Sequence, residues 1–321
     1  MKVNSWKKNI KKNKQYFIGL ITGFLFAAFL LNIAPLAVAK TRSNLVTLTR
    51  LFNASPTPTP SLEKQLEEIT KDVLPESVPL EVTLKDTIVR LVEVGAIDKE
   101  KFISLYQARG GLTPQEQALL DKPSDEKLVI TAENANLFLN LLWPLGIANK
   151  TNVLADGPMG KEYAKDVGSF ASTGGWTLGK EPGGTLFNRF PILPLSREQE
   201  TLVKELAESI FRSCCGNSTY FPDCNHGAAM LGFLELAVSQ GLPKEKIYQK
   251  ALALNSYWFP QTYADLAVYF QKKKNTPWKS VDAKEVLGSE YSSGQGYRKI
   301  SKLLQDEGLL PKVTGGGGCG V

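Results

Sequence analysis

Apolar residues recur with helical spacing through most of residues 61–312, and this periodicity is the strongest constraint on the fold. The pattern gives each predicted helix an apolar face, which has to be buried against another element. Few segments alternate between apolar and polar residues, as a half-buried strand would. The sequence therefore predicts a mainly α, single helical domain over residues 61–312, with short β pieces at most.

Capping residues mark where several of these helices begin. Ser196 precedes one helical pattern, and Cys224 or Asn225 opens another that ends before a glycine. Residues 83–94 are also predicted to be helical. Three tryptophans stand among apolar neighbours and are expected to be buried: Trp143, Trp176 and Trp258.

Residues 155–191 interrupt the helical pattern. This segment contains eight glycines, and its aromatic residues include Phe170, Trp176, Phe187 and Phe190. A glycine-rich segment favours turns and irregular backbone. We expect a Gly/aromatic-rich irregular excursion that packs on the helical domain.

Residues 1–39 have the composition of a signal peptide or an N-terminal membrane anchor. Lysines up to Lys14 precede an uncharged, largely apolar run from Tyr16 to Ala39, which is long enough to span a bilayer as a helix. Lysines on this flank alone predict a cytoplasmic N-terminus with the body outside. The run ends in an Ala-x-Ala pattern that a signal peptidase accepts. Both interpretations remain open, and they predict a protein that is either held in the cell membrane or secreted.

Two further segments flank the predicted helical domain. Residues 40–60 include alternating prolines, which favour an extended linker, here a Pro/Thr stalk. Residues 313–321 form a Gly-rich tail that carries Cys319 and is predicted to be flexible.

The charge of the protein is concentrated at its amino terminus. Residues 1–40 contain seven of the 38 basic residues and no acidic residue, which leaves 31 basic and 32 acidic side chains in the remainder. A nearly neutral body has no general field that would attract phosphate backbones. The sequence therefore predicts no nucleic-acid partner.

Three of the four cysteines and the only histidine lie within thirteen residues, as Cys214, Cys215, Cys224 and His226. Thiolate and imidazole are soft ligands, so they predict a copper or zinc site or a redox couple. Met230 follows His226 by one helical turn and is a possible additional ligand. Cys319 on its glycine arm could reach the same place. The spacing C-C-x8-C-x-H matches no standard zinc-finger or haem-attachment pattern.

Three functional interpretations remain open for these residues. The first is soft-metal binding or a thiol-redox role. The second is a disulfide-stapled helical binding or scaffold module without chemistry, because cysteines outside the cytoplasm tend to be oxidised. The third is a cysteine hydrolase acting on the cell wall or on peptides. The segment around Asp223 and Cys224 is superficially similar to the nucleophile helix of papain-like hydrolases, but no histidine follows His226 to serve as base. The sequence assigns no catalytic residue and leaves open whether the protein is an enzyme.

Overall fold

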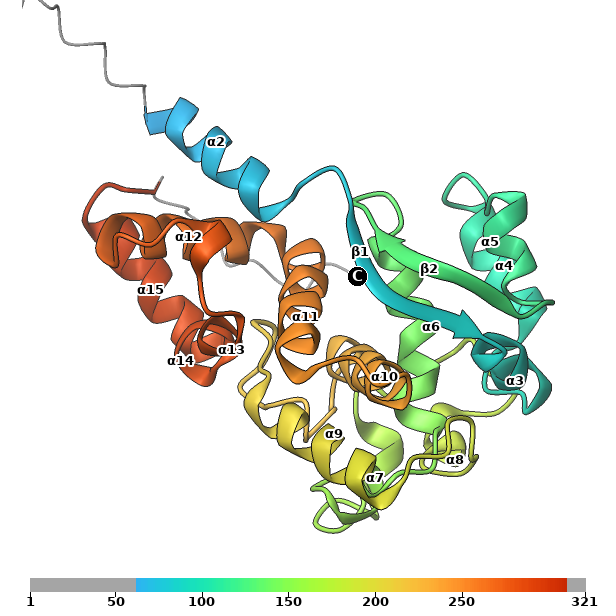
Figure 1. Cartoon of the computed structure of the whole chain (residues 1–321). Coiled ribbons are helices and arrows are strands. Elements are labelled where there is room, and N and C mark those ends of the chain that lie inside the picture. Colours follow the sequence, from blue (N-terminus) through green and yellow to red (C-terminus); the bar gives the residue numbers. More distant parts are fainter. Residues whose placement is uncertain (1–61, 311–321) are drawn as a thin grey trace, which may run out of the picture. The chain divides into compact units, whose positions relative to one another are not determined.

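Two long helices, α6 (Ala135–Ala148) and α10 (Asn225–Ser239), cross at the centre of the structure, a computed structural model that describes residues 62–310 (Figure 1). Glycines at the crossing allow the two backbones to approach. A Cβ atom on Gly146 would overlap the carbonyl oxygen of Ala228, and one on Gly232 would overlap that of Leu142. Every residue of α10 from Gly227 to Val238 is buried. This helix pair is the core of the fold.

Longer helices surround the central pair. They are amphipathic, as the apolar periodicity predicts, and their apolar faces join the core formed by α6 and α10. These helices are α2 (Leu62–Val73), α4 (Lys99–Gln107), α9 (Arg197–Ser209), α11 (Lys244–Trp258), α12 (Pro260–Lys273) and α15 (Gly294–Asp306). Short helices connect them: α3 (Thr87–Glu93), α5 (Pro114–Ala118), α7 (Asn152–Asp156), α8 (Gly183–Leu186), α13 (Ala283–Leu287), α14 (Ser289–Ser292), and the 3-10 turns η1 (Val167–Ser169) and η2 (Trp278–Ser280). The prediction of a mainly helical fold is confirmed.

A two-stranded antiparallel sheet is the exception to the helical pattern. It pairs β1 (Val78–Lys85) with β2 (Ser124–Ile130), with Val78 opposite Ile130. The prediction of a helix over residues 83–94 is wrong at its start, because Thr83–Lys85 belong to β1 and α3 begins only at Thr87. The physical reason is an inward-facing row with period two, formed by Leu80, Val82 and Leu84.

The irregular excursion at residues 155–191 packs on the helical core as expected. Its regular structure is limited to the end of α7, the η1 turn and the short helix α8. The indole of Trp143 in α6 donates a hydrogen bond of 2.6 Å to the carbonyl oxygen of Ser172. Trp143 and Trp176 are buried, which confirms two of the three tryptophan predictions. The third is wrong, because Trp258 is only half-buried.

Several predictions fall on residues that the structure does not describe. They are the signal peptide or anchor (1–39), the linker (40–60) and the tail with Cys319 (313–321). Within residues 62–310, no helix combines the length and the apolar character needed to cross a bilayer.

Candidate metal centre

The cysteines lie in the loop that joins α9 to the central helix α10. A short antiparallel bridge between Phe211 and Ser218 folds the loop back on itself. Two hydrogen bonds tie it to neighbouring helices, from the Phe211 amide to the Leu287 carbonyl (2.8 Å) and from the Gly294 amide to the Cys215 carbonyl (2.7 Å). The end of α13 and the start of α15 therefore both hold the loop, which leads into the amino terminus of α10.

Three sulfur atoms gather in this loop. The Sγ atom of Cys214 lies 3.5 Å from that of Cys224 and 4.0 Å from that of Cys215. The Cys215 and Cys224 sulfurs lie within 4.8 Å of each other. In a tetrahedral zinc site with Zn–S bonds of about 2.3 Å, two sulfurs are about 3.8 Å apart. The observed separations bracket that value, so the sulfurs are spaced as ligands of one ion would be.

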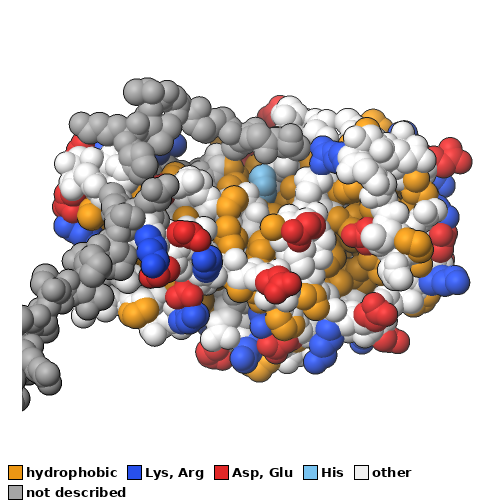
Figure 2. Space-filling model, turned by 90° about the horizontal axis from the view of Figure 1, so that it is seen from above, with side chains coloured by type: hydrophobic (Ala, Val, Ile, Leu, Met, Phe, Trp, Pro, Cys, Tyr) orange, Lys and Arg blue, Asp and Glu red, His pale blue; other side chains and the backbone are white. Residues whose placement is uncertain are grey.

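His226 brings a ring nitrogen to the same place. Its ligand atom lies within 4.8 Å of both the Cys214 and Cys224 sulfurs. The buried Nδ1 atom has no hydrogen-bond partner, although a buried polar atom is costly to leave unpaired. The imidazole packs against Phe259, with the ring centroids 4.4 Å apart, and against Trp258 at 5.9 Å. Figure 2 shows the single histidine reaching the surface among apolar side chains. These donors could hold a metal ion.

Arg212 lies beneath the cysteines and is 1 % exposed. Its Nε atom donates to the Cys224 sulfur (3.1 Å), and Nη2 donates to the Asp223 carboxylate (2.6 Å). The same guanidinium also donates to the backbone carbonyls of Asn217 and Phe221, each at 2.9 Å. A Cβ atom on Gly227 would lie 2.5 Å from the Arg212 Cζ atom, so glycine gives the guanidinium its room. Arg212 thus connects the later part of the loop to Cys224, the residue that caps α10.

The four functional groups differ in their protonation. Hydrogen bonds from Cys214 and Cys215 lower the pKa of Cys224 well below that of an ordinary thiol, and Arg212 adds to this against the effect of burial. The interactions with Cys215 and Cys224 raise the pKa of Cys214. For Cys215, the interaction with Cys214 lowers the pKa, but Cys224 and burial outweigh it and raise the pKa to about 11. Of the three thiols, Cys224 alone has a lowered pKa, so it loses its proton most readily.

Burial lowers the pKa of His226 to about 4, while Cys224 opposes this shift and Arg212 adds to it. The imidazole is therefore neutral at pH 7, which is the form that binds metals. A cation would have to remove protons from Cys214 and Cys215 but not from His226.

A second group of donors shares Cys224 and consists of Cys215, Asp223 and Cys224, again within 4.8 Å of one another. Its carboxylate is already engaged, because Asp223 accepts hydrogen bonds from Arg212 and from the Asn217 side chain (2.8 Å). The group with His226 has the unpartnered nitrogen. It is therefore the better prepared of the two for a soft ion.

The structure thus places four of the residues that the sequence singled out in two groups that share Cys224. His226 belongs to the group with Cys214, and Cys215 belongs to the group with Asp223. Met230 is buried in the hydrophobic core, and its role as a ligand stays a prediction. Cys319 lies outside the described residues. Sequence reasoning missed Arg212. The only signal would have been a charged residue two positions before Cys214, and such a residue is usually exposed.

The geometry offers little support for a nucleophile and base. The Cys224 sulfur interacts with the Arg212 side chain, with the Cys214 sulfur and with the Gly227 amide at 3.4 Å. A hydrolase would instead need the imidazole within hydrogen-bond reach of the sulfur. The arrangement resembles a ligand cluster more than a catalytic dyad.

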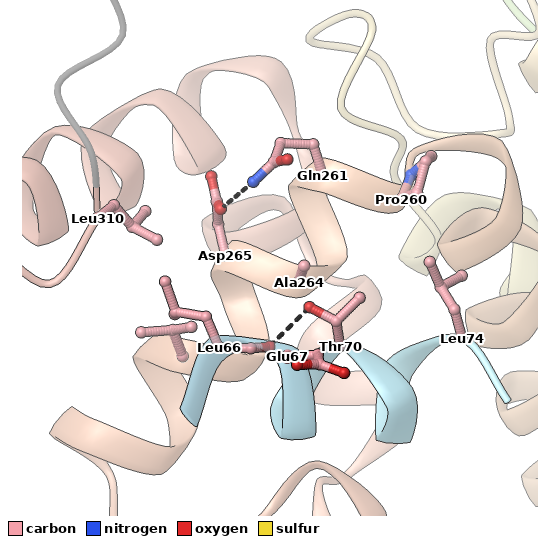
Figure 3. A pocket seen from close by; sticks show the side chains of 10 residues that line it. Leu66, Glu67, Thr70, Leu74, Pro260, Gln261, Ala264, Asp265 and Leu310 are labelled. Carbon is pink, nitrogen blue, oxygen red and sulfur yellow. Dashed lines mark hydrogen bonds between the residues drawn. The ribbon is translucent and has the colours of Figure 1, made fainter. Parts of the chain in front are cut away.

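A groove of about 390 Å³ lies elsewhere, between α2 and α12, with Leu310 at one end (Figure 3). Its polar groups are paired with each other or with neighbours. Asp265 accepts hydrogen bonds from Gln261 (2.7 Å) and Tyr297 (2.8 Å), and Thr70 donates to the Leu66 carbonyl (2.8 Å). The groove contains none of the cysteines, so the loop before α10 remains the candidate site.

Comparisons of the chain with protein-family models, with curated proteins and with solved structures gave no match.

Proposed function

We propose that the protein carries a soft-metal centre held by Cys214, Cys215, Cys224 and His226. The observation that supports this is the convergence of the Cys214 and Cys224 sulfurs with a ring nitrogen of His226, next to the Cys215 sulfur. The buried Nδ1 atom of the same imidazole has no hydrogen-bond partner. Buried polar atoms rarely lack partners, and an ion bound through Nδ1 would supply one. The imidazole is neutral, as a metal requires, and the lowered pKa of Cys224 favours the thiolate that a metal binds.

Zinc(II) is the ion that fits four donors best, because it prefers a closed tetrahedral set of thiolates and imidazoles. Three thiolates and a neutral imidazole around zinc(II) have a net charge of −1. The buried guanidinium of Arg212 offsets part of this charge, because it also pairs with the Asp223 carboxylate. Copper(I) with Cys214, Cys224 and His226 alone reaches the same net charge. The charge therefore does not separate the two ions. Zinc requires Cys215 as the fourth donor, and the Cys215 sulfur lies 4.0 Å from that of Cys214 but outside the group that contains His226. Cys319 stays a candidate for an additional donor.

The test is metal analysis of the protein purified without a polyhistidine tag. We expect about one zinc ion per chain. The variants Cys224→Ser and His226→Ala should lose it, because each removes a donor that the other residues cannot replace. His226 is the only histidine. Its single set of imidazole NMR resonances should therefore shift when zinc is added to the metal-free protein.

Met230→Leu is the matched control, since it keeps a buried apolar side chain one turn from His226 and should leave the zinc content unchanged. Copper at unit stoichiometry in place of zinc would correct the identity of the ion. No metal and no free thiols would contradict the proposal and support the disulfide-stapled scaffold module.

We further propose that this metal-binding body lies outside the cytoplasm, attached to the membrane or secreted. The proposal rests on the lysine-flanked apolar run at residues 16–39 and on the proline-rich segment that follows. Protease added to intact spheroplasts should degrade the body if it is attached at the outer face, while a secreted form should appear in the medium. A body that stays protected inside the cell would contradict this location.

A further inference from the structure

We infer that the metal centre is gated by a reversible disulfide between Cys214 and Cys224, which cannot coexist with the bound ion. This inference rests on the proposed metal site and adds its regulation. The two sulfurs lie 3.5 Å apart, closer than the sulfurs of Cys214 and Cys215 at 4.0 Å. A disulfide bond is about 2.04 Å long, so about 1.5 Å of sulfur motion separates the two states.

The neighbouring cysteines favour this pairing over the others. Cys214 and Cys215 are consecutive, so their Cα atoms lie about 3.8 Å apart, below the usual range of about 4.4–6.8 Å for a disulfide. The Cys215 sulfur instead lies 4.0 Å from the Asp223 carboxylate. Cys215 is therefore left as a thiol when Cys214 and Cys224 are joined.

The two partners differ in how firmly they are held. Cys224 is the N-cap of α10, and its sulfur accepts hydrogen bonds from Gly227 and from Arg212. Cys214 lies in the turn that leads to Gly216, where an added Cβ atom would meet nothing within 4 Å. The motion that closes the bond is therefore expected on the Cys214 side, and α10 can keep its position.

The chemistry is a two-electron thiol–disulfide exchange with a low-molecular-weight disulfide as oxidant. The Cys224 thiolate attacks one sulfur of the oxidant, breaks its S–S bond and releases one thiolate. Cys214, after giving its proton to that thiolate, attacks the Cys224 sulfur and releases the second. Two cysteine sulfurs are oxidised and one small disulfide is reduced to two thiols. Zinc itself is not a redox partner.

The consequence for the ion follows from the donor count. Oxidation converts two of the four donors into a neutral disulfide and leaves only Cys215 and His226. Arg212 loses the thiolate that accepts its Nε–H bond but keeps its ion pair with Asp223 at 2.6 Å. The loop thus stays anchored while its affinity for the ion falls steeply. A reductant restores the original four donors.

The experiment uses the zinc-loaded full chain treated with oxidised glutathione. A chromogenic chelator measures the released zinc, and peptide mapping by mass spectrometry locates the disulfide. We expect one zinc released for each Cys214–Cys224 link, and zinc uptake again after dithiothreitol. The metal-free Cys215→Ser variant tests the pairing, and peptide mapping should still find the Cys214–Cys224 link in it.

The outcomes separate this inference from the one on which it rests. A reduced chain that binds no zinc before any oxidant is added would overturn the metal site and the gate together. A zinc-loaded chain that keeps its zinc after oxidation would overturn the gate alone. A link that joins Cys215 or Cys319 in place of Cys214 or Cys224 would do the same.

Discussion

Replacing Arg212 by methionine is expected to lower the free energy of unfolding by about 3–5 kcal/mol, the range for removing one partner of a buried ion pair. The side chain is 1 % exposed and donates four hydrogen bonds, two to charged groups and two to backbone carbonyls. Its loss leaves the Asp223 carboxylate and the Cys224 thiolate without a countercharge. Denaturant unfolding of the metal-free protein measures the effect.

Arg189→Met is the matched control for this substitution. Arg189 pairs with Glu181 at 3.1 Å, but both side chains are about half exposed (49 % and 52 %), so the pair contributes at most about 1 kcal/mol. The loss of stability in Arg212→Lys should lie between the losses in these two variants, because one ammonium group keeps the charge but cannot reach all four acceptors. A loss of less than about 1 kcal/mol in Arg212→Met would contradict a structural role for this residue.

Gly146→Ala is expected to destabilise the protein by about 3 kcal/mol or more. The added methyl group would overlap the Ala228 carbonyl oxygen, and both helix backbones at this crossing are buried. Alanine favours helix over glycine by about 1 kcal/mol, but overpacking a core typically costs about 1–3 kcal/mol and occasionally more. The cost of a clash with backbone lies at the upper end of this range, because no side-chain rotation relieves the clash. Thermal unfolding measures the difference.

Gly168→Ala is the matched control, since an added Cβ atom at that position meets nothing within 4 Å. A substitution there should change the stability by no more than about 0.5 kcal/mol. Equal stability of the two variants would show that α6 and α10 do not pack as closely as the structure describes.

Helix positions were the part of the fold that the sequence predicted well. The capping box at Ser196 is present, with Ser196 and Gln199 bonding each other's backbone amides, and α10 begins directly after Cys224 as expected. Capping and apolar periodicity act within a few residues, so a single sequence contains them in full. The C-terminal end of β1, Thr83–Lys85, was misassigned to a helix, because so short a segment does not distinguish the two periods.

Other features depend on residues far apart in the chain. Trp258 was expected to be buried, but its position beside His226 leaves it half-buried at the site. The carbonyl of Asp223 accepts a hydrogen bond of 3.0 Å from the Ser172 amide in the glycine-rich excursion. No local pattern at residue 172 indicates that contact.

By itself, the sequence determined the helical class of the protein and the chemical kind of its candidate site, because residue identity fixes which atoms are soft donors and local spacing fixes the helices. Only the tertiary structure decided that the Cys214 and Cys224 sulfurs meet an imidazole nitrogen, that Cys215 joins Cys224 in a second group, and that Arg212 is buried beside them. The physical reason is that ligand distances and pKa shifts arise from burial and from contacts across the fold. Here Phe211 and Cys215 of the loop are held by Leu287 in α13 and Gly294 in α15, each more than 70 residues further along the chain than its partner.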